Sequence, residues 1–297
     1  MKSQAAMEYL MTYGWAILVI AVVLAALYSL GIFNPNTFAP KASAGSCEVV
    51  RPFGPTTTTD VHLEGTCTNM IPKYVASFNG KNSYISYNFN NIINKITISS
   101  WIKTKSNNEM IIKLQNNTPL IYLEVGATTD GGNANELVIY LRNNIGGGAI
   151  PWNTGFLINN NQWYFITLSW NGTIATVYVD GNKVASRGFS GTITLIGSKG
   201  YIGSKGYIGS IGSISSTPSF QFNGSIANVQ IYNKALSANQ ITAVYQEGIG
   251  GDPIDVTHLV AWYPLNGNAN DYSGNDYNGK AVNVGYPSTW YRTYSAP

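Results

Sequence analysis

Charged residues are scarce in this sequence. Its 297 residues include 17 Lys and Arg and 14 Asp and Glu, so 10% of the chain is charged, against roughly 25% in an average soluble protein. The net charge of +3 forms neither a basic stripe nor an acidic tail, which argues against nucleic acid as a partner. The two histidines, His62 and His258, lack metal-ligand spacing. The overall charge of the chain therefore does not identify its ligand.

Cysteine is almost absent. Cys47 and Cys67 are the only two, and both follow the apolar N-terminal segment. In an oxidising compartment they can form a disulfide that closes a loop of about 20 residues and contributes on the order of 3 kcal/mol. The alternative is a pair of unbridged buried thiols. A disulfide is expected if the chain lies in an oxidising compartment, and the N-terminal sequence predicts which compartment the chain occupies.

One long apolar run is present. Residues 9–30 contain no charged residue and no proline, which is long enough for a helix to span a bilayer. The positive charge before the run is Lys2 and the terminal amine, and positive flanks stay in the cytoplasm. We therefore expect one N-terminal helix in the cell membrane, with the bulk of the chain extracellular and the two cysteines bridged.

The segment KSQAAMEYLMTYGWAILVI resembles the class III signal peptide of archaeal type IV pilin-like proteins. The resemblance implies that residues 1–3 are a leader, which a prepilin peptidase removes by cutting between Ser3 and Gln4. It implies that residues 4–33 form a helix that the pilus-assembly machinery packs against other pilin subunits. Glu8 would neutralise the new N-terminal ammonium of a neighbour, since a buried charge is tolerated when it is paired. The alternative places Glu8 at the headgroup level of an uncleaved anchor.

Residues 34–46 are predicted to be a short linker, because Pro35 and Pro40 end the helix. Residues 47–297 then show short strands separated by turns, an arrangement that predicts an antiparallel β-sandwich. The dipeptides Asn171-Gly172 and Asp180-Gly181 have the chemistry of two-residue hairpins. A short helix is expected in LSANQITAVYQEG, where Ser237 and Gln240 have the spacing of a capping box. Candidate strands are KITISSWIK, LIYLEV, ELVIYLR and QWYFITLSW.

Several of these stretches resemble the LamG-like, concanavalin A-like jelly-roll family. The matching pieces are ASFNGKNSYISY, ITISSWIKT, NQWYFITLSWNGTIATVYVDGNKVAS and FNGSIANVQIYNKALSANQI, in the family's order. The fold class implied is a mainly β, LamG-like jelly roll after a pilin-type helix. The motif that usually opens this domain lies instead at residues 257–285. We favour a circular permutation; the alternatives are a truncated second domain and a strand donated to another subunit.

Catalytic carboxylates are not evident. Glycoside hydrolysis needs two carboxylates flanking the scissile bond, and related glucanases hold them in an E-x-D-x-x-E pattern. No such pattern occurs: Glu124 is isolated, and Glu136 has no carboxylate two or four residues later. We therefore expect no catalytic residues and a protein that is not an enzyme.

Two loops offer oxygen ligands of the kind that calcium takes. The first contains Asp271, Asn275 and Asp276, and the second, DGGNANE, contains Glu136. Neither has EF-hand spacing. Both also fit ordinary Asx-rich turns, which we favour, so calcium in the first loop remains a cofactor hypothesis.

Surface features complete the prediction. Asn116, Asn171 and Asn223 lie in acceptor sequons for glycosylation. Sugar-stacking aromatics would come from Trp152, Trp170, Trp262 and Trp290, whereas Trp101 and Trp163 match family core positions. The repeat IGSKGYIGSKGYIGSIGS, residues 196–213, suggests an elongated hairpin or flexible loop.

The sequence therefore predicts a type IV pilin-like surface subunit or adhesin that presents a lectin-like LamG domain to carbohydrate or another cell-surface ligand. One alternative is an uncleaved membrane-anchored lectin-like protein that does not polymerise. A less favoured alternative is an anchored polysaccharide hydrolase.

Overall fold

A computed structural model of the chain gives two compact units, Met1–Ala42 and Ser43–Pro297. The structure describes residues 13, 15–25, 47–65, 67, 72–89, 92–107, 109–115, 119–126, 133–142, 150–194, 198–203 and 221–288.

In the first unit, residues 15–25 are helical and their apolar side chains are exposed, with Trp15 at 69%. Within the parts of the chain described, no helix is long and apolar enough to cross a bilayer. The predicted cleavage site at Ser3 and Gln4, and the assembly residue Glu8, lie outside the described residues, so these remain predictions.

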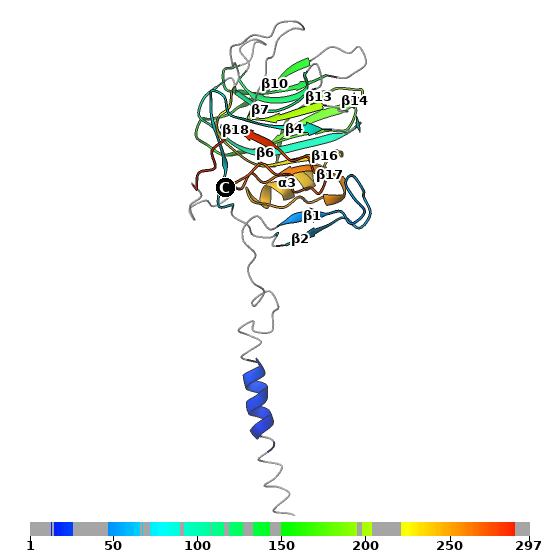
Figure 1. The fold of residues 1–297 in the computed structure, drawn as a ribbon, viewed down its shortest axis with the longest axis vertical. Coiled ribbons are helices and arrows are strands. Elements are labelled where there is room, and N and C mark those ends of the chain that lie inside the picture. Colours follow the sequence, from blue (N-terminus) through cyan, green and yellow to red (C-terminus); the bar gives the residue numbers. More distant parts are fainter. Residues whose placement is uncertain are drawn as a thin grey trace, which may run out of the picture. The chain divides into compact units, whose positions relative to one another are not determined.

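The second unit is a sandwich of two antiparallel sheets (Figure 1). Sheet I has the order β13 (Asn182–Gly188), β12 (Ile174–Val179), β11 (Tyr164–Trp170), β6 (Ile96–Thr104), β16 (Asn223–Tyr232) and β17 (Leu259–Tyr263), with β3 (Ala76–Asn79) also on β16. Sheet II has the order β10 (Ile150–Leu157), β9 (Glu136–Leu141), β8 (Pro119–Val125), β7 (Glu109–Gln115), β15 (Ser198–Ile202), β4 (Tyr84–Phe89) and β18 (Lys280–Val282). Smaller pairs are β1 (Glu48–Val50) with β2 (His62–Glu64), and β5 (Ile92–Ile93) with β14 (Ile193–Thr194).

The main core lies between the sheets. Alternate side chains of sheet II, such as Ile85, Ile112 and Ile139, meet side chains such as Ile98 and Ile166 of sheet I, and all five are fully buried. This packing is what a period-two apolar pattern on β-branched residues produces, because successive side chains point to opposite faces. The predicted antiparallel sandwich is confirmed.

The outer face of sheet I is also covered. Helix α3 (Ala238–Gln246) inserts Ile241 and Val244 into a second apolar cluster that contains Trp101 and Phe165. Strand β6, which the alternation predicts to be half-buried, is therefore buried on both faces. This cluster does not cover the outer face of sheet II.

Helix α3 begins as predicted. The Ser237 side chain accepts a hydrogen bond from the Gln240 N–H, and the Gln240 side chain accepts one from the Ser237 N–H. The Asp180-Gly181 hairpin is also confirmed, since Val179 pairs with Asn182 and both turn residues have positive φ. The Asn171-Gly172 prediction was wrong in detail. The Asn171 side chain accepts from the Thr173 and Ile174 N–H groups and supports a longer turn.

The C-terminal segment completes its own sandwich. Strand β17 pairs with β16, and β18 pairs with β4, so residues from 259 to 282 add an edge to each sheet of the same chain. A further bridge joins Ser77 to Gly285. The C-terminal strands therefore pair within this chain's own sandwich, and the circular permutation stays a prediction.

The first copy of the Gly-Ser repeat is a central strand and not the loop or elongated hairpin that its composition suggests. Strand β15 pairs with β4 on one side and with β7 on the other. Gly200 is required there, because a Cβ atom at this position would lie 2.0 Å from the Tyr87 ring. Glycine thus reflects close packing at this position.

Candidate functional site

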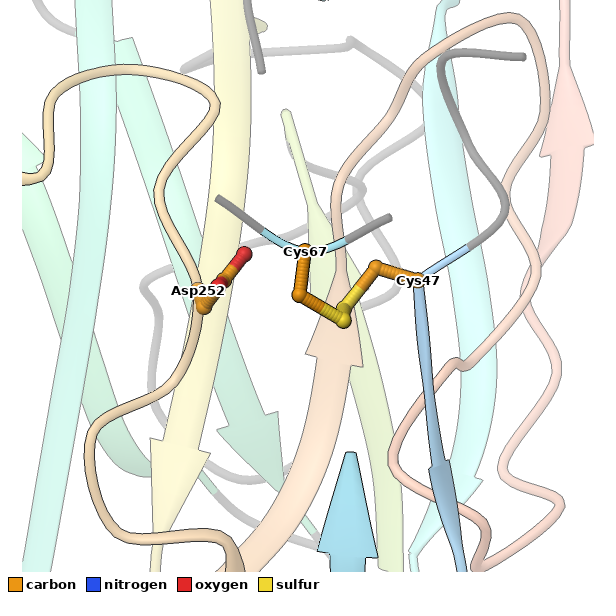
Figure 2. Close-up of side chains that lie close together, drawn as sticks. All are labelled: Cys47, Cys67 and Asp252. Carbon is orange, nitrogen blue, oxygen red and sulfur yellow. A yellow bond between two sulfur atoms is a disulfide. The ribbon is translucent and has the colours of Figure 1, made fainter. Parts of the chain in front are cut away.

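The disulfide predicted for Cys47 and Cys67 is present, with an S–S distance of 2.07 Å (Figure 2). It joins the start of β1 to the residues just beyond β2. The Val49 N–H donates to the Tyr272 carbonyl, which ties this hairpin to the C-terminal segment. The disulfide therefore closes the β1–β2 hairpin, and the Val49–Tyr272 hydrogen bond ties that hairpin to the segment that follows β17.

Arg51 holds the same hairpin in place through backbone carbonyls. Its guanidinium donates to Ser273 O at 3.0 Å, to Val256 O at 3.1 Å and to Leu259 O at 2.8 Å, and also to Thr57 O. A planar fork of five N–H donors suits this arrangement. The contacts serve docking of the hairpin and leave the guanidinium no role in binding a ligand.

Asp252 lies beside the disulfide (Figure 2). Its carboxylate oxygen and the two sulfurs lie within 4.8 Å of one another, and no other such group of three occurs in the described residues. Because the sulfurs are bonded to each other, they are not thiolate ligands for a metal. Desolvation, followed by the charge of Glu247, raises the pKa of Asp252 to about 7.

This raised pKa predicts a pH-dependent stability. Between pH 4 and 7 the folded protein holds a proton on Asp252 that the unfolded chain releases, so stability falls as pH rises through this window and levels off above it. We expect Asp252→Asn to reduce this fall, while the part due to the raised pKa of Glu109 remains, and to stabilise the protein at pH 8 by about 1 to 2 kcal/mol, discounted for partial exposure. Urea unfolding at pH 5 and pH 8 measures it. Equal pH slopes for variant and wild type would contradict the assignment.

The calcium candidate loop is built as a hydrogen-bonded turn. Asp271 Oδ1 accepts from the N–H groups of Trp262 and Ser273, at 2.9 Å each, and Oδ2 accepts from the Ser273 hydroxyl and the Tyr277 N–H. These four bonds occupy the lone pairs of the carboxylate. A calcium ion at Asp271 would have to displace them.

The other two candidate ligands differ in their surroundings. Asn275 is buried; its amide donates to the Leu259 and Val260 carbonyls, and its oxygen accepts from the Thr56 N–H. Asp276 is exposed in the following turn. These hydrogen bonds fit the Asx-turn interpretation that the sequence favours, and calcium binding stays a prediction.

Two carboxylates of sheet II, Glu109 and Glu136, accept hydrogen bonds from neighbouring segments of the chain. Glu136 accepts from the N–H groups of Asn133 and Gly155, and Glu109 accepts from the Thr104 and Ser106 hydroxyls. Burial raises the pKa of Glu109 to about 7. Both carboxylates thus have structural hydrogen bonds.

Two of the four tryptophans predicted for sugar stacking, Trp170 and Trp262, are buried. Trp170 is fully buried and donates its indole N–H to the Phe189 carbonyl, and Trp262 is buried and donates to Asn228 Oδ1. Trp152 is partly buried against the core, and Trp290 lies outside the described residues. Trp101 is buried as predicted, and Trp163 is partly buried.

The sequons differ in their surroundings. Asn171 is exposed, and its side-chain oxygen accepts from the Thr173 hydroxyl. Asn223 is half-buried at the start of β16 and packs against Gly80. Asn116 lies outside the described residues. Glycosylation at these positions remains a prediction.

A row of tyrosine and lysine side chains crosses the outer face of sheet II. Cross-strand partners share a face of a sheet, and the register joins the row from β18 to β9. Its members are Lys280, Ser86, Tyr201, Lys113, Tyr122 and Tyr140.

The row has a buried and an accessible end. At the β7–β9 end, Lys113, Tyr122 and Tyr140 are buried, and the last two rings stack with centroids 4.4 Å apart. At the β15–β4–β18 end, the side chains are exposed or half-exposed. We call this end the tyrosine–lysine face; it consists of Tyr84, Ser86, Asn88, Lys199, Tyr201 and Lys280.

The aromatic centre of the tyrosine–lysine face is the pair Tyr84 and Tyr201. Their ring centroids are 6.1 Å apart in an edge-to-face arrangement, with both side chains half-exposed. Sequence reasoning missed these residues because Tyr201 and Lys199 lie in the Gly-Ser repeat. The available signal was the alternation Lys199, Tyr201 against Gly200, Ile202, which is the period of a strand.

Comparison with known proteins agrees with this architecture. Residues 79–242 match the family model described as Laminin_G_3, concanavalin A-like lectin/glucanases superfamily. The chain is similar in structure to a Bacteroides ovatus protein named as a candidate carbohydrate-binding protein, with 19% identity, a TM-score of 0.52, and coverage of 76% of this chain and 66% of that one. It is also similar to a SAP-like pentraxin from Limulus polyphemus, with 18% identity, a TM-score of 0.51, and coverage of 73% of this chain and 96% of that one.

At these identities, the two structures support the fold alone. No curated protein matches the sequence. The family match covers more than half of the chain and spans strands of both sheets. The chain therefore belongs to the concanavalin A-like lectin/glucanases superfamily.

Proposed function

We propose that this protein is a non-enzymatic, surface-displayed adhesin whose sandwich domain binds glycans at the tyrosine–lysine face. The observation that carries the proposal is the difference between the two sheets. Helix α3 and the second apolar cluster cover sheet I, whereas part of sheet II presents half-exposed tyrosine rings beside amide, hydroxyl and ammonium groups. An apolar surface with a few placed polar groups suits a sugar ring.

The proposal of binding without catalysis is supported by the state of the acidic side chains. Glu109 and Glu136 are occupied by hydrogen bonds to loops, and strands β4, β15 and β18 contain no Asp or Glu. A pair of carboxylates flanking a bound sugar, which glycoside hydrolysis requires, is therefore not offered by these three strands. A reducing-sugar assay that released product from any glycan would oppose the proposal.

Removal of one ring tests the face. We expect Tyr201→Ala to weaken binding of a glycan identified from an oligosaccharide panel about tenfold, because the sugar loses its apolar contact and Tyr84 loses its neighbour. Isothermal titration measures the dissociation constant. Tyr201→Phe keeps the ring and serves as the matched control, with affinity within about threefold of wild type. Unchanged affinity of a folded Tyr201→Ala variant would place the glycan elsewhere.

We further propose that the chain is processed and assembled as a type IV pilin-like subunit. This second part rests on the N-terminal sequence, where Glu8 precedes an uncharged run through residue 30. The alternative is an uncleaved anchor that does not polymerise. Mass spectrometry of the N-terminal peptide from the native cell surface distinguishes them: a chain that begins at Gln4 supports processing, and a chain that retains Lys2 and Ser3 opposes it.

A further inference from the structure

We infer that the tyrosine–lysine face selects anionic polysaccharides over neutral ones. This inference rests on the proposed glycan-binding function and narrows its ligand class. A neutral chain and an acidic chain can both contact Tyr84 and Tyr201, but only the acidic chain gains from the charges beside them. The two charged side chains of strands β4, β15 and β18 are both positive.

Two ammonium groups border the accessible rings. Lys280 pairs across the sheet with Ser86, which in turn pairs with Tyr201. Lys199 lies on the same face of β15, two residues before Tyr201. Both lysines are exposed, and among the described residues neither forms an ion pair. They are therefore available to a ligand from solvent.

The carboxylates that share this side of sheet II are remote and buried. Glu124 lies on β8 and is 1% exposed, and Glu136 begins β9 and is 5% exposed. Strands β8 and β9 are separated from β15 by β7. At about 4.8 Å per strand, β8 is about 10 Å from β15. A ligand on the rings therefore lies nearer to the two exposed lysines than to these carboxylates.

The spacing of the lysines favours a polymer over a single acidic sugar. Lys280 and Lys199 lie two strands and two residues apart, so their Cα atoms are about 12 Å from each other. They stand on either side of Ser86 and Tyr201, so one small anion contacts both ammonium groups only if both side chains lean inward over the rings. A chain with a negative charge on successive units contacts both while it lies across the rings.

Because the chain as a whole carries little net charge, the two lysines distinguish the tyrosine–lysine face from the rest of the protein. The protein has a net charge of only +3. Selection for anions therefore depends on these two positions and not on a general positive potential. Replacing two exposed lysines elsewhere removes the same net charge and provides the matched control. Lys81, in the turn after β3, and Lys183, on β13, are exposed and suit this purpose.

The test uses the whole protein and matched glycans that differ only in charge. Polygalacturonate is compared with its fully methyl-esterified form, and dextran sulfate with dextran, by biolayer interferometry at about 20 mM and 500 mM salt. We expect at least one anionic member to bind about tenfold more tightly than its neutral partner at low salt. High salt should reduce this difference in affinity. We expect Lys199→Gln/Lys280→Gln to remove that preference and Lys81→Gln/Lys183→Gln to keep it.

Each other outcome has a definite meaning. Equal binding of both members of each pair, or a panel that yields only neutral ligands, overturns the charge selection and leaves the glycan-binding proposal standing. A preference that survives in Lys199→Gln/Lys280→Gln, with thermal melting as in wild type, assigns the anion to another surface and overturns the inference. Absence of binding to every glycan in the panel removes the proposed function itself.

Discussion

Replacing Asp271 by alanine is expected to lower the free energy of unfolding by about 3 to 4 kcal/mol, with or without calcium. The carboxylate accepts four hydrogen bonds, and three of the donors are the backbone N–H groups of Trp262, Ser273 and Tyr277. Alanine leaves these donors without partners in a partly buried loop. Because Trp262 belongs to β17, the loss extends to the edge of sheet I. Urea unfolding followed by tryptophan fluorescence measures the change.

Two controls separate a structural carboxylate from a calcium ligand. Asp276→Asn, in the same loop but exposed, is expected to stay within about 0.5 kcal/mol of wild type. Millimolar calcium followed by a chelator is expected to leave the wild-type midpoint unchanged. A midpoint that rises with calcium, and that no longer does so in Asp271→Ala, would show instead that the loop binds the ion and that its hydrogen bonds rearrange.

Removal of the disulfide is the second large effect that we expect. Cys47→Ser/Cys67→Ser opens a loop with a sequence separation of 20, and the chain-entropy estimate for such a loop is about 3 kcal/mol. The free energy of unfolding should fall by that amount, and the β1–β2 hairpin should exchange its amide hydrogens first. Urea titration and hydrogen exchange measure the two consequences.

The same experiment has an internal control. Dithiothreitol should bring wild type to the stability of the double variant and should not change the variant. Because Arg51 and the Val49–Tyr272 hydrogen bond still hold the hairpin, the sandwich itself is expected to stay folded. A loss below about 1 kcal/mol would mean that the unfolded chain is already compact near these cysteines.

Features that depend on neighbouring residues were predictable from the sequence. The capping box of α3, the Asp180-Gly181 turn and the dense β-branched strands each have a cause that lies within a few residues. The sandwich followed because such strands bury alternate side chains. The disulfide was predicted from an inferred location and is present.

Features that depend on distant contacts were not predictable. In the sequence, Gly200 suggests a loop. In the structure it lies in a central strand, where the Tyr87 ring packs directly against it. The oxygens of Asp271 and Asn275 are visible in the sequence, but the backbone donors that occupy them come partly from residues such as Trp262 and Thr56. Trp170 and Trp262 looked like binding residues, and only tertiary packing shows that they are core.

The position of the disulfide also determines how the domain responds to a mechanical load. Tension applied to the chain on the N-terminal side reaches Cys47 first, and the covalent bond transfers it directly to Cys67. The intervening residues, including β1 and the Arg51 contacts, stay outside the line of force. The segment between the two cysteines, which would measure about 65 to 70 Å if fully extended, therefore stays folded when the protein is pulled. Reduction of this one bond would place β1 and the Arg51 contacts in the line of force, and the segment would extend only after those contacts break.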